Sequence, residues 1–225
     1  YNEKGWLNES GAKYPVEVAI LKDNVLLTID TSGSGLNRRG YRLAQGEAPI
    51  KETLAASLIR LANWKGDTPL IDPFCGSGTI AIEACLIAQN IAPGFNREFV
   101  SEQWNIMPAN IYDDYRDEAD KMADYDKEIE VYASDIDPEM IEIAKRNAEE
   151  VGLSDIIKFS VKDVNTLTID TEEPVALIGN PPYGERIGDR EEVEEMYRYI
   201  GKLMKQHPFL STYILTSNKE FEYLV

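Results

Sequence analysis

Short apolar runs and stretches of helical periodicity alternate along most of the chain. From residue 69 onward, a strand-like run is followed by a glycine turn and an apolar helix, and strands and helices then alternate. An acidic insertion from 91 to about 127, which we expect to be partly helical, interrupts this alternation. The expected strands span residues 69–72, 128–133, 156–161, 175–178 and 211–216, and the expected helices span 79–89, 138–151 and about 191–206. This alternation predicts an α/β fold, with a doubly wound parallel sheet that carries helices on both faces.

A second pattern precedes this alternation. Two β-rich runs, 16–21 and 25–30, are separated by Lys22-Asp23-Asn24, which predicts a hairpin. Residues 31–42 are rich in glycine, serine and arginine, and we expect a flexible, basic connector there. Leucines and alanines then recur at helical spacing, which predicts a helix over 49–62 that its first proline opens.

Composition argues against a membrane protein, a disulfide scaffold or a metal site. Hydrophobic residues make up 43% of the 225 residues, and no apolar stretch approaches the roughly 18 to 20 residues of a membrane span. Two cysteines, Cys75 and Cys85, and one histidine, His207, leave too few ligands for zinc. We therefore expect a soluble, cytoplasmic protein without metal. Because the chain does not begin with methionine, we also expect it to be a fragment of a longer protein.

The net charge of −17 is unevenly distributed. Residues 1–70 hold nine Lys/Arg and eight Asp/Glu, so the acidity lies in residues 71–225. A surface of this sign repels phosphate backbones, and a nucleic-acid partner would need a local basic patch or a further domain. The arginines at 38, 39 and 42 form such a cluster, which could contact phosphate or lie in a solvated linker.

Three motifs place acids or glycines at the carboxyl ends of successive strands. DPFCGSGT (72–79) has closely spaced glycines that let a ligand approach the backbone, but it lacks both the GK[ST] of a P-loop and the third glycine of a dinucleotide fingerprint. In SDID (134–137), Asp135 could accept hydrogen bonds from ribose hydroxyls. In KDV (162–164), Asp163 could accept a hydrogen bond from the adenine amine. Each motif alone could be a helix cap or a solvated turn, but their order predicts a nucleoside site.

A fourth motif, GNPPYGERIG, follows the apolar strand at 175–178. Two consecutive prolines cannot donate to a ladder, so the strand stops there and presents Asn180 and Tyr183 in a fixed geometry. A proline-rich turn with a packed tyrosine is the alternative interpretation.

Together, DPFCGSGT, SDID, KDV and NPPY resemble the class I S-adenosylmethionine methyltransferases that modify exocyclic amines. LNRRGYR (36–42), APIKETLAASLI (48–59) and GNPPYGERI are similar to the narrower family of THUMP-associated RNA methyltransferases, related to the bacterial large-subunit rRNA guanine-N2 methyltransferase. The resemblance covers about residues 16–217. It implies a Rossmann-like methyltransferase domain over 43–225, preceded over 1–42 by the tail of a THUMP-like RNA-binding domain and a linker. The closing hairpin of the family would then be missing or incomplete.

The resemblance also implies a cofactor, a partner and a set of site residues. The cofactor is S-adenosylmethionine, and the partner is RNA, in the first place ribosomal RNA. Asn180 and the Pro181 carbonyl would accept the hydrogens of the target amine, and Tyr183 would stack on a base taken out of its helix. The implied cofactor-binding residues are Asp72, Phe74, Gly76, Gly78, Thr79, Asp135, Ile136, Asp163, Val164 and Asn180. The implied substrate contacts are Pro182, Arg186, Arg38, Arg39 and Arg42.

The residues are also compatible with several alternatives. The NPPY motif also serves enzymes that methylate adenine N6 in DNA or RNA and glutamine amides in proteins. A non-catalytic RNA-binding factor could retain the cofactor fold. Cys75 or Cys85 could act as the nucleophile of carbon-5 pyrimidine methylation, although packing is the simpler interpretation. Glu185 and Arg186 could form a local ion pair instead of contacting substrate. His207 is expected at a surface helix end, and the tryptophans are expected to pack.

Overall fold

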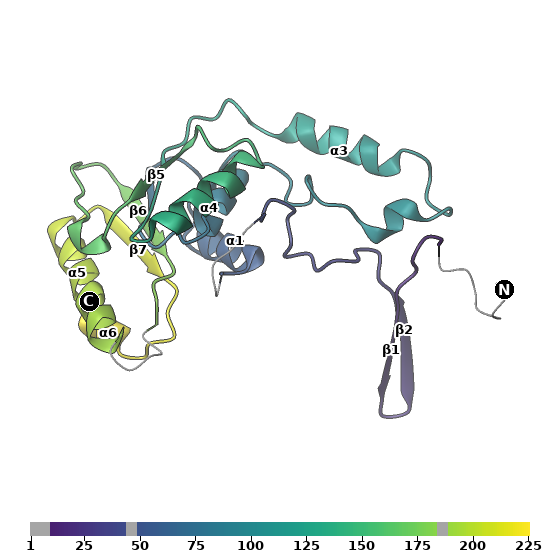
Figure 1. The fold of residues 1–225 in the computed structure, drawn as a ribbon, viewed down its shortest axis with the longest axis horizontal. Coiled ribbons are helices and arrows are strands. Elements are labelled where there is room, and N and C mark those ends of the chain that lie inside the picture. Colours follow the sequence, from purple (N-terminus) through teal and green to yellow (C-terminus); the bar gives the residue numbers. More distant parts are fainter. Residues whose placement is uncertain (1–9, 44–48, 184–188) are drawn as a thin grey trace.

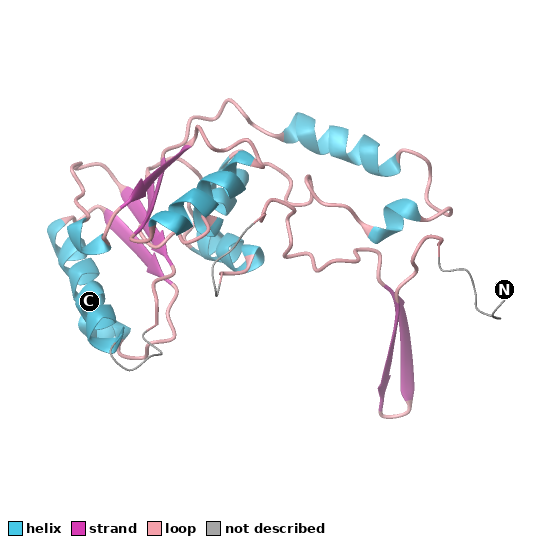
Figure 2. Ribbon diagram, in the orientation of Figure 1, coloured by secondary structure: helices cyan, strands magenta, loops and turns pink. Residues whose placement is uncertain are grey.

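A five-stranded parallel sheet forms the centre of the molecule (Figures 1 and 2), in a computed structural model that describes residues 10–43, 49–183 and 189–225. Its strands are β3 (Leu70–Asp72), β4 (Val131–Asp135), β5 (Ile157–Val161), β6 (Val175–Gly179) and β7 (Leu210–Ile214). They lie in the order β5-β4-β3-β6-β7. The chain winds outward from β3 to β5 and then returns to β6 on the other side of β3. This reversal places a topological switch point between β3 and β6, where ligands bind in open α/β sheets.

Helices cover both faces of the sheet, as the sequence predicts. They are α1 (Glu52–Leu61), α2 (Thr79–Ala88) and α4 (Pro138–Glu149) on one face, and α5 (Asp189–Gln206) and α6 (Phe221–Leu224) on the other. Strand β6 shows why. Ala176 and Ile178 pack into the cluster beneath α1, α2 and α4, whereas Leu177 packs toward α5 with Leu203. Alternate residues of a strand point to opposite faces, so a continuously apolar strand requires cover on both.

Two elements begin three residues later than predicted, and the other bounds differ by two residues or fewer. Strand β4 begins at Val131 rather than at residue 128 and ends at Asp135. Helix α1 begins at Glu52, because Lys51 has extended backbone angles (φ −69°, ψ 141°) and occupies the N-cap position. The prediction that Pro49 opens the helix is therefore wrong. Pro49 instead lines two neighbouring cavities.

The predicted hairpin is confirmed and projects from the body of the molecule (Figure 1). It consists of β1 (Val16–Leu21) and β2 (Asn24–Ile29), which pair antiparallel. Its turn has two residues rather than three, Lys22 and Asp23, with φ of 48° and 61°. Positive φ at both positions is the geometry that matches the twist of paired strands. Every residue of the two strands is exposed. Its assignment to a THUMP-like domain stays a prediction.

The connector at 31–42 differs from the flexible segment that its composition suggests. It is fixed by the insertion, which contains η1 (Val100–Gln103) and α3 (Ile111–Met122) and is partly helical as predicted. The buried guanidinium of Arg97 donates to the carbonyls of Ser32, Ser34, Gly35 and Arg38, at 2.6–3.3 Å. A planar donor group that satisfies four carbonyls holds a loop that has no regular structure of its own.

Within the described ranges, no helix is long and apolar enough to cross a membrane. Those residues also contain no group of three or more His, Cys, Asp or Glu side chains that could hold a metal ion. Trp64 and Trp104 are buried, and each donates its indole N–H to a backbone carbonyl, so both pack as expected. Trp6 lies outside the described residues. His207 directly follows α5, at the expected helix end.

Candidate functional site

The four motifs meet around one cavity of about 340 Å³ at the carboxyl edge of the sheet. Because β3, β4, β5 and β6 are parallel, the loops that follow them converge at this edge, beside the switch point. Of the expected cofactor-binding residues, those that line the cavity are Phe74, Gly76, Thr79, Asp135, Ile136, Asp163, Val164 and Asn180. Asp72 and Gly78 are not part of its lining.

The two glycines of DPFCGSGT do different things. Gly76 has a φ of 50°, and its N–H donates to Asp135 Oδ2 at 2.9 Å. A Cβ at this position would meet no atom within 4 Å, so the loop leaves open space there. Gly78 has a φ of 83°, and a Cβ there would lie 3.1 Å from the Ala144 Cβ of α4. Gly78 therefore permits close packing of α2 against α4, whereas Gly76 leaves room beside the cavity.

Asp72 is a fully buried carboxyl at the end of β3. Its Oδ1 accepts a hydrogen bond from the Phe74 N–H at 3.2 Å, and its Oδ2 has no partner among the described residues. Burial, with a smaller contribution from the nearby Asp135 carboxylate, raises the pKa of Asp72 to about 8, although the hydrogen bond from the Phe74 N–H acts in the opposite direction. A buried carboxylate without a second partner is costly, which is why the protonated form is favoured.

Asp135 and Asp163 hold the next two corners of the cavity. Asp135 accepts from the N–H groups of Gly76 and Asp137, at 2.9 and 3.0 Å, which fixes its carboxylate. Asp163 caps the short helix η2 (Val164–Thr166) by accepting from the Asn165 N–H at 2.9 Å. The capping role left open by the sequence is thus present. Each carboxylate still has lone pairs for a ligand.

The NPPY segment joins the cavity through Asn180 and Pro182, whereas Pro181 and Tyr183 are not among the described residues of its lining. The Tyr183 hydroxyl donates to Asn180 Oδ1 at 2.5 Å. The sequence interpretation has Tyr183 as a stacking ring and Asn180 as a free acceptor, but here the two side chains hold each other. The Asn180 amide oxygen thus already accepts one hydrogen bond within the protein.

Three residues that sequence reasoning missed support this segment. Met196 of α5 lines the cavity, and the hydroxyl of the buried Tyr197 donates to Pro182 O at 3.3 Å and lies 3.0 Å from Thr216 Oγ1. At Gly179, a Cβ would lie 2.9 Å from the Phe74 ring. Helical spacing marks an apolar face on α5 but does not show which strand end it meets. The glycine directly before NPPY was the one available signal.

The three connector arginines differ from one another. Arg39 Nε lies 3.5 Å from Glu83 Oε1, a carboxyl whose pKa burial raises. Arg42 Nε lies 3.1 Å from Glu52 Oε1, and its Nη2 donates to Ile50 O and Thr79 Oγ1. Arg38 is exposed. Arg39 and Arg42 are thus held by protein groups. The expected contacts Arg186 and Glu185 lie outside the described residues.

Neither cysteine has the environment of a nucleophile. Burial and the nearby Asp72 carboxyl raise the pKa of the Cys75 thiol far above its usual range. Burial raises the pKa of the Cys85 thiol to about 12. Because the thiolate is the reactive form, both groups are inert at neutral pH, and packing accounts for them.

Comparison with known proteins identifies the family. Residues 39–225 match the family described as "RMKL-like, methyltransferase domain". The chain is 54% identical over 217 residues to the Bacillus subtilis RNA methyltransferase YpsC, whose name marks the activity as provisional. This match covers 96% of this chain and 56% of YpsC. It is 40% identical to the ribosomal RNA large subunit methyltransferase K/L of Shewanella frigidimarina, over 86% of this chain and 28% of that protein.

Solved structures agree with this result. A predicted N6-adenine-specific DNA methylase from Listeria monocytogenes is 54% identical with a TM-score of 0.91, and the match covers 96% of this chain and 57% of that one. SMU.472, a provisional methyltransferase solved with SAH, is 42% identical with a TM-score of 0.89, over 96% and 56% of the two chains. The chain therefore spans little more than half of YpsC and of the two solved chains, and 28% of the K/L protein. The predicted resemblance is confirmed, and the chain belongs to the RMKL-like methyltransferase domain family.

Proposed function

We propose that this chain is the catalytic domain of an S-adenosylmethionine-dependent methyltransferase that acts on an exocyclic amine of an RNA base, guanine N2 in large-subunit ribosomal RNA. The names of the relatives support RNA, and the K/L relatives support ribosomal RNA. One observation carries the proposal: Asn180 shares a single cavity with Asp135 and Asp163. The acceptor for the target amine and the two acids that suit a nucleoside cofactor therefore line the same cavity.

The residues around the cavity fit S-adenosylmethionine, and the relative SMU.472 was solved with SAH. Asp72 is not part of the lining and would shape the methionine end from behind, because its Oδ1 holds the backbone N–H of Phe74, which lines the cavity. Gly76 leaves room for the backbone to approach the ligand, Asp135 suits the ribose hydroxyls, and Asp163 suits the adenine amine. When bound, the cofactor supplies an electrophilic methyl group on a positively charged sulfur.

Asn180 and Pro181 would prepare the target nitrogen. The lone pair of an exocyclic amine is delocalised into the ring, which makes the amine a poor nucleophile. Acceptors at both of its hydrogens favour a pyramidal nitrogen whose lone pair is directed at the methyl group. The Asn180 amide oxygen and the Pro181 carbonyl supply these acceptors, and the adjacent prolines fix them before reaction.

Tyr183 would exchange one role for another during binding. Its hydroxyl orients the Asn180 amide by donating to Oδ1. When the target amine takes this position, the Tyr183 ring becomes available to stack on the extruded base. The methylated amine is cationic and loses its proton to water, so the site needs no dedicated base.

The test is nucleoside mass spectrometry on unmodified ribosomal RNA, transfer RNA and duplex DNA, after incubation of the full-length protein with labelled cofactor. We expect N2-methylguanosine in ribosomal RNA alone. N6-methyladenosine, or label only in protein, would overturn the proposed substrate and keep the cofactor. No transfer to any of them would overturn the proposed activity.

The Asn180→Ala variant tests the role of the amide. We expect turnover to fall on the order of a hundredfold, because a preorganised partner of the transition state is lost. Asn105→Ala is the matched control, since Asn105 is an exposed asparagine of the insertion. A loss of less than about threefold in Asn180→Ala would contradict the assignment.

A further inference from the structure

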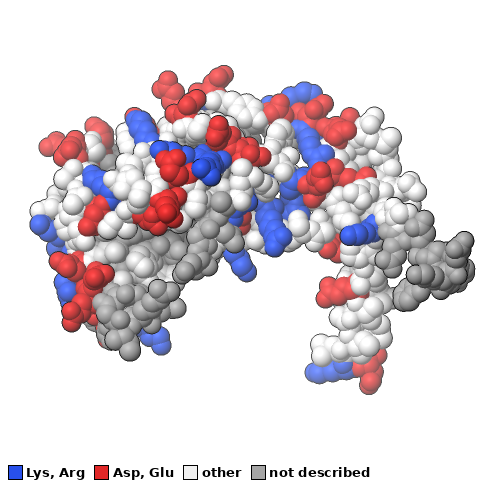
Figure 3. Space-filling view, viewed as in Figure 1, with Lys and Arg blue, Asp and Glu red and all other residues white. Residues whose placement is uncertain are grey.

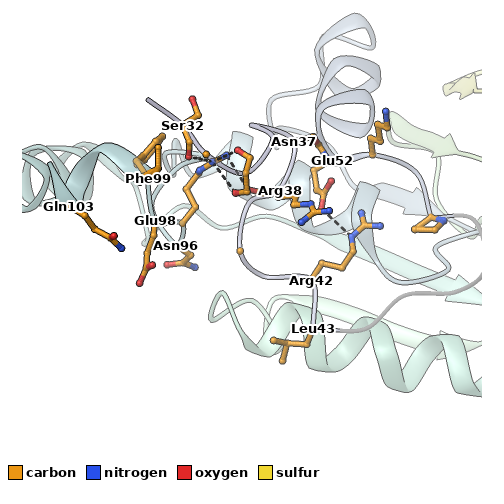
Figure 4. Close-up of a pocket in the computed structure, with 17 residues that line it drawn as sticks. Ser32, Asn37, Arg38, Arg42, Leu43, Glu52, Asn96, Glu98, Phe99 and Gln103 are labelled. Atoms are coloured by element: carbon orange, nitrogen blue, oxygen red, sulfur yellow. Dashed lines mark hydrogen bonds and ion pairs between the residues drawn. The ribbon is translucent and has the colours of Figure 1, made fainter. Parts of the chain in front are cut away.

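A second cavity, about three times as large as the first, opens beside the candidate site. It measures about 1010 Å³, against about 340 Å³ for the first. Three segments far apart in the sequence form its walls: residues 32–43 of the connector, 49–52 before and at the start of α1, and 96–103 of the insertion (Figure 4). We call it the connector cleft.

The charge of the connector cleft is opposite to that of the protein. Its lining contains four cations and two acids, in a chain with a net charge of −17. The cations are Arg38, Arg42, Lys51 and Arg97, and the acids are Glu52 and Glu98. Figure 3 shows Lys and Arg side chains gathered near the hollow between the body and the hairpin, while acids are spread over the outer surface. A local positive potential inside an acidic surface favours an anionic ligand at this position.

Two of the four cations are occupied by the protein. Arg97 is buried and donates to connector carbonyls, and Arg42 lies 3.1 Å from Glu52. Arg38 and Lys51 are exposed, and their side chains make no hydrogen bond or ion pair with any described residue. These two side chains can therefore meet a ligand without breaking a contact within the described parts of the chain.

The connector cleft adjoins the candidate site. Pro49 lines both cavities. Arg42 of the cleft wall donates to the Thr79 hydroxyl, which lines the smaller cavity, at 2.9 Å. A polymer whose target base enters the smaller cavity would thus pass its neighbouring residues along the cleft.

The aromatic content of the cleft indicates which part of the polymer it would contact. Phe99 is the aromatic side chain of its lining, and this ring already packs against the Arg97 guanidinium, 4.8 Å from the centroid, and against Tyr112, 5.8 Å between centroids. Base stacking needs a free ring face, whereas phosphate binding needs exposed cations. The described lining supplies exposed cations, Arg38 and Lys51, and no free aromatic ring face.

We propose that the connector cleft binds the sugar-phosphate backbone of the RNA strand next to the target nucleotide, through Arg38 and Lys51. This inference rests on the proposed function. It narrows the expected arginine cluster to Arg38 and adds Lys51, which lies at the N-cap of α1 and was not foreseen. Binding of this kind positions the strand without reading its sequence.

The test compares the full-length protein with its Arg38→Gln/Lys51→Gln double variant. The affinity for a fluorescein-labelled oligouridylate is measured by anisotropy from about 50 to 200 mM salt. We expect the double variant to bind roughly tenfold more weakly at low salt, with the salt slope reduced by about 1.4 for two lost contacts. The KM for RNA should rise in parallel, while kcat at saturating RNA and the affinity for SAH stay unchanged.

Arg60→Gln/Lys205→Gln is the matched control, since both side chains are exposed in the last turns of α1 and α5 and neither lines the cleft. Equal RNA affinity and salt slope in the Arg38/Lys51 variant and the wild type would overturn the cleft proposal, even if methylation of RNA is observed. The reverse result, cleft-dependent binding without methylation of any RNA, would overturn the proposed function and keep the cleft.

Discussion

Asp72 combines complete burial with an unpaired oxygen, and both follow from its place at the end of the central strand β3. Neighbouring strands and the following loop enclose the carboxyl on all sides. Its raised pKa thus records the absence of a compensating charge within the described protein. The sequence shows an acid at a strand end, but it cannot show that one oxygen has no partner.

This pKa predicts a pH dependence of stability. Since the pKa of Asp72 rises from 3.8 to about 8 on folding, the folded protein keeps a proton that the unfolded chain releases above about pH 4. The contribution of Asp72 to the free energy of unfolding should therefore fall by up to about 1.4 kcal/mol per pH unit between about pH 4 and 8, and level off above that.

Urea denaturation of the wild type and of Asp72→Asn at several pH values measures this contribution as a difference. The variant should lose stability less steeply than the wild type as pH rises through that window. Parallel curves would show that Asp72 titrates normally in the folded state.

At the scale of elements, α5 supports the NPPY segment from below the sheet edge. Tyr197 is fully buried and packs edge-on against Phe221, with ring centroids 4.9 Å apart. Its hydroxyl reaches Pro182 O and Thr216 Oγ1. The helix thereby connects the segment after β6 to the segment that follows β7, and its contact with Pro182 restrains the neighbours of Asn180 and Pro181 in the chain.

Tyr197→Phe tests this support, because it keeps the ring and removes the hydroxyl. We expect stability to fall by about 1 to 3 kcal/mol, since buried partners lose a hydrogen bond. We also expect kcat to fall roughly tenfold, with an unchanged affinity for SAH, because small displacements of positioning groups slow the chemical step.

Tyr199→Phe is the matched control on the same helix, since the Tyr199 hydroxyl donates to Leu167 O at 2.9 Å, away from NPPY. It should lower stability by a similar amount and leave kcat near the wild-type value. If both variants lowered kcat equally, Tyr197 would have no specific role in positioning.

At the scale of the whole molecule, Arg97 decides where the hairpin and the connector cleft lie relative to the sheet. Its four carbonyl partners belong to a connector that has no helix or strand of its own. Gly40 contributes to the same junction, because a Cβ there would lie 2.2 Å from Asn96 O. The insertion and the connector thus form one unit, which gives the molecule its curved outline (Figure 1).

Arg97→Met should release the connector and leave the sheet domain folded. We expect amide hydrogen exchange in residues 31–42 to speed up roughly ten- to a hundredfold, because local opening no longer breaks four charge-assisted hydrogen bonds. Exchange in β3 and β6 should stay slow. Arg97→Lys should not restore protection, since an ammonium lacks the planar fork of the guanidinium. Unchanged exchange in Arg97→Met would show that other contacts fix the connector.

The sequence by itself determined the α/β architecture, the hairpin and the positions of the four motifs. Strands such as β6 are apolar on both faces, and helices such as α4 carry a capping acid, a proline at N1 and one apolar face, so the local pattern and the tertiary requirement agree. The motif residues Asp135, Asp163 and Asn180 could be placed around a common site, because parallel strands bring their carboxyl ends to one edge.

Only the tertiary structure decided how individual side chains are used. Arg39 pairs with Glu83, which is far away in the sequence. Arg42 pairs with Glu52, the first residue of a helix whose start the periodicity placed too early. The glycines and serines of the connector show neither helical nor strand periodicity, so the sequence predicts a flexible segment. Arg97 nevertheless fixes it from about 60 residues further along the chain. Periodicity reports the face on which a residue lies. The partner of a charged or hydroxyl group depends on long-range packing, which no local pattern contains.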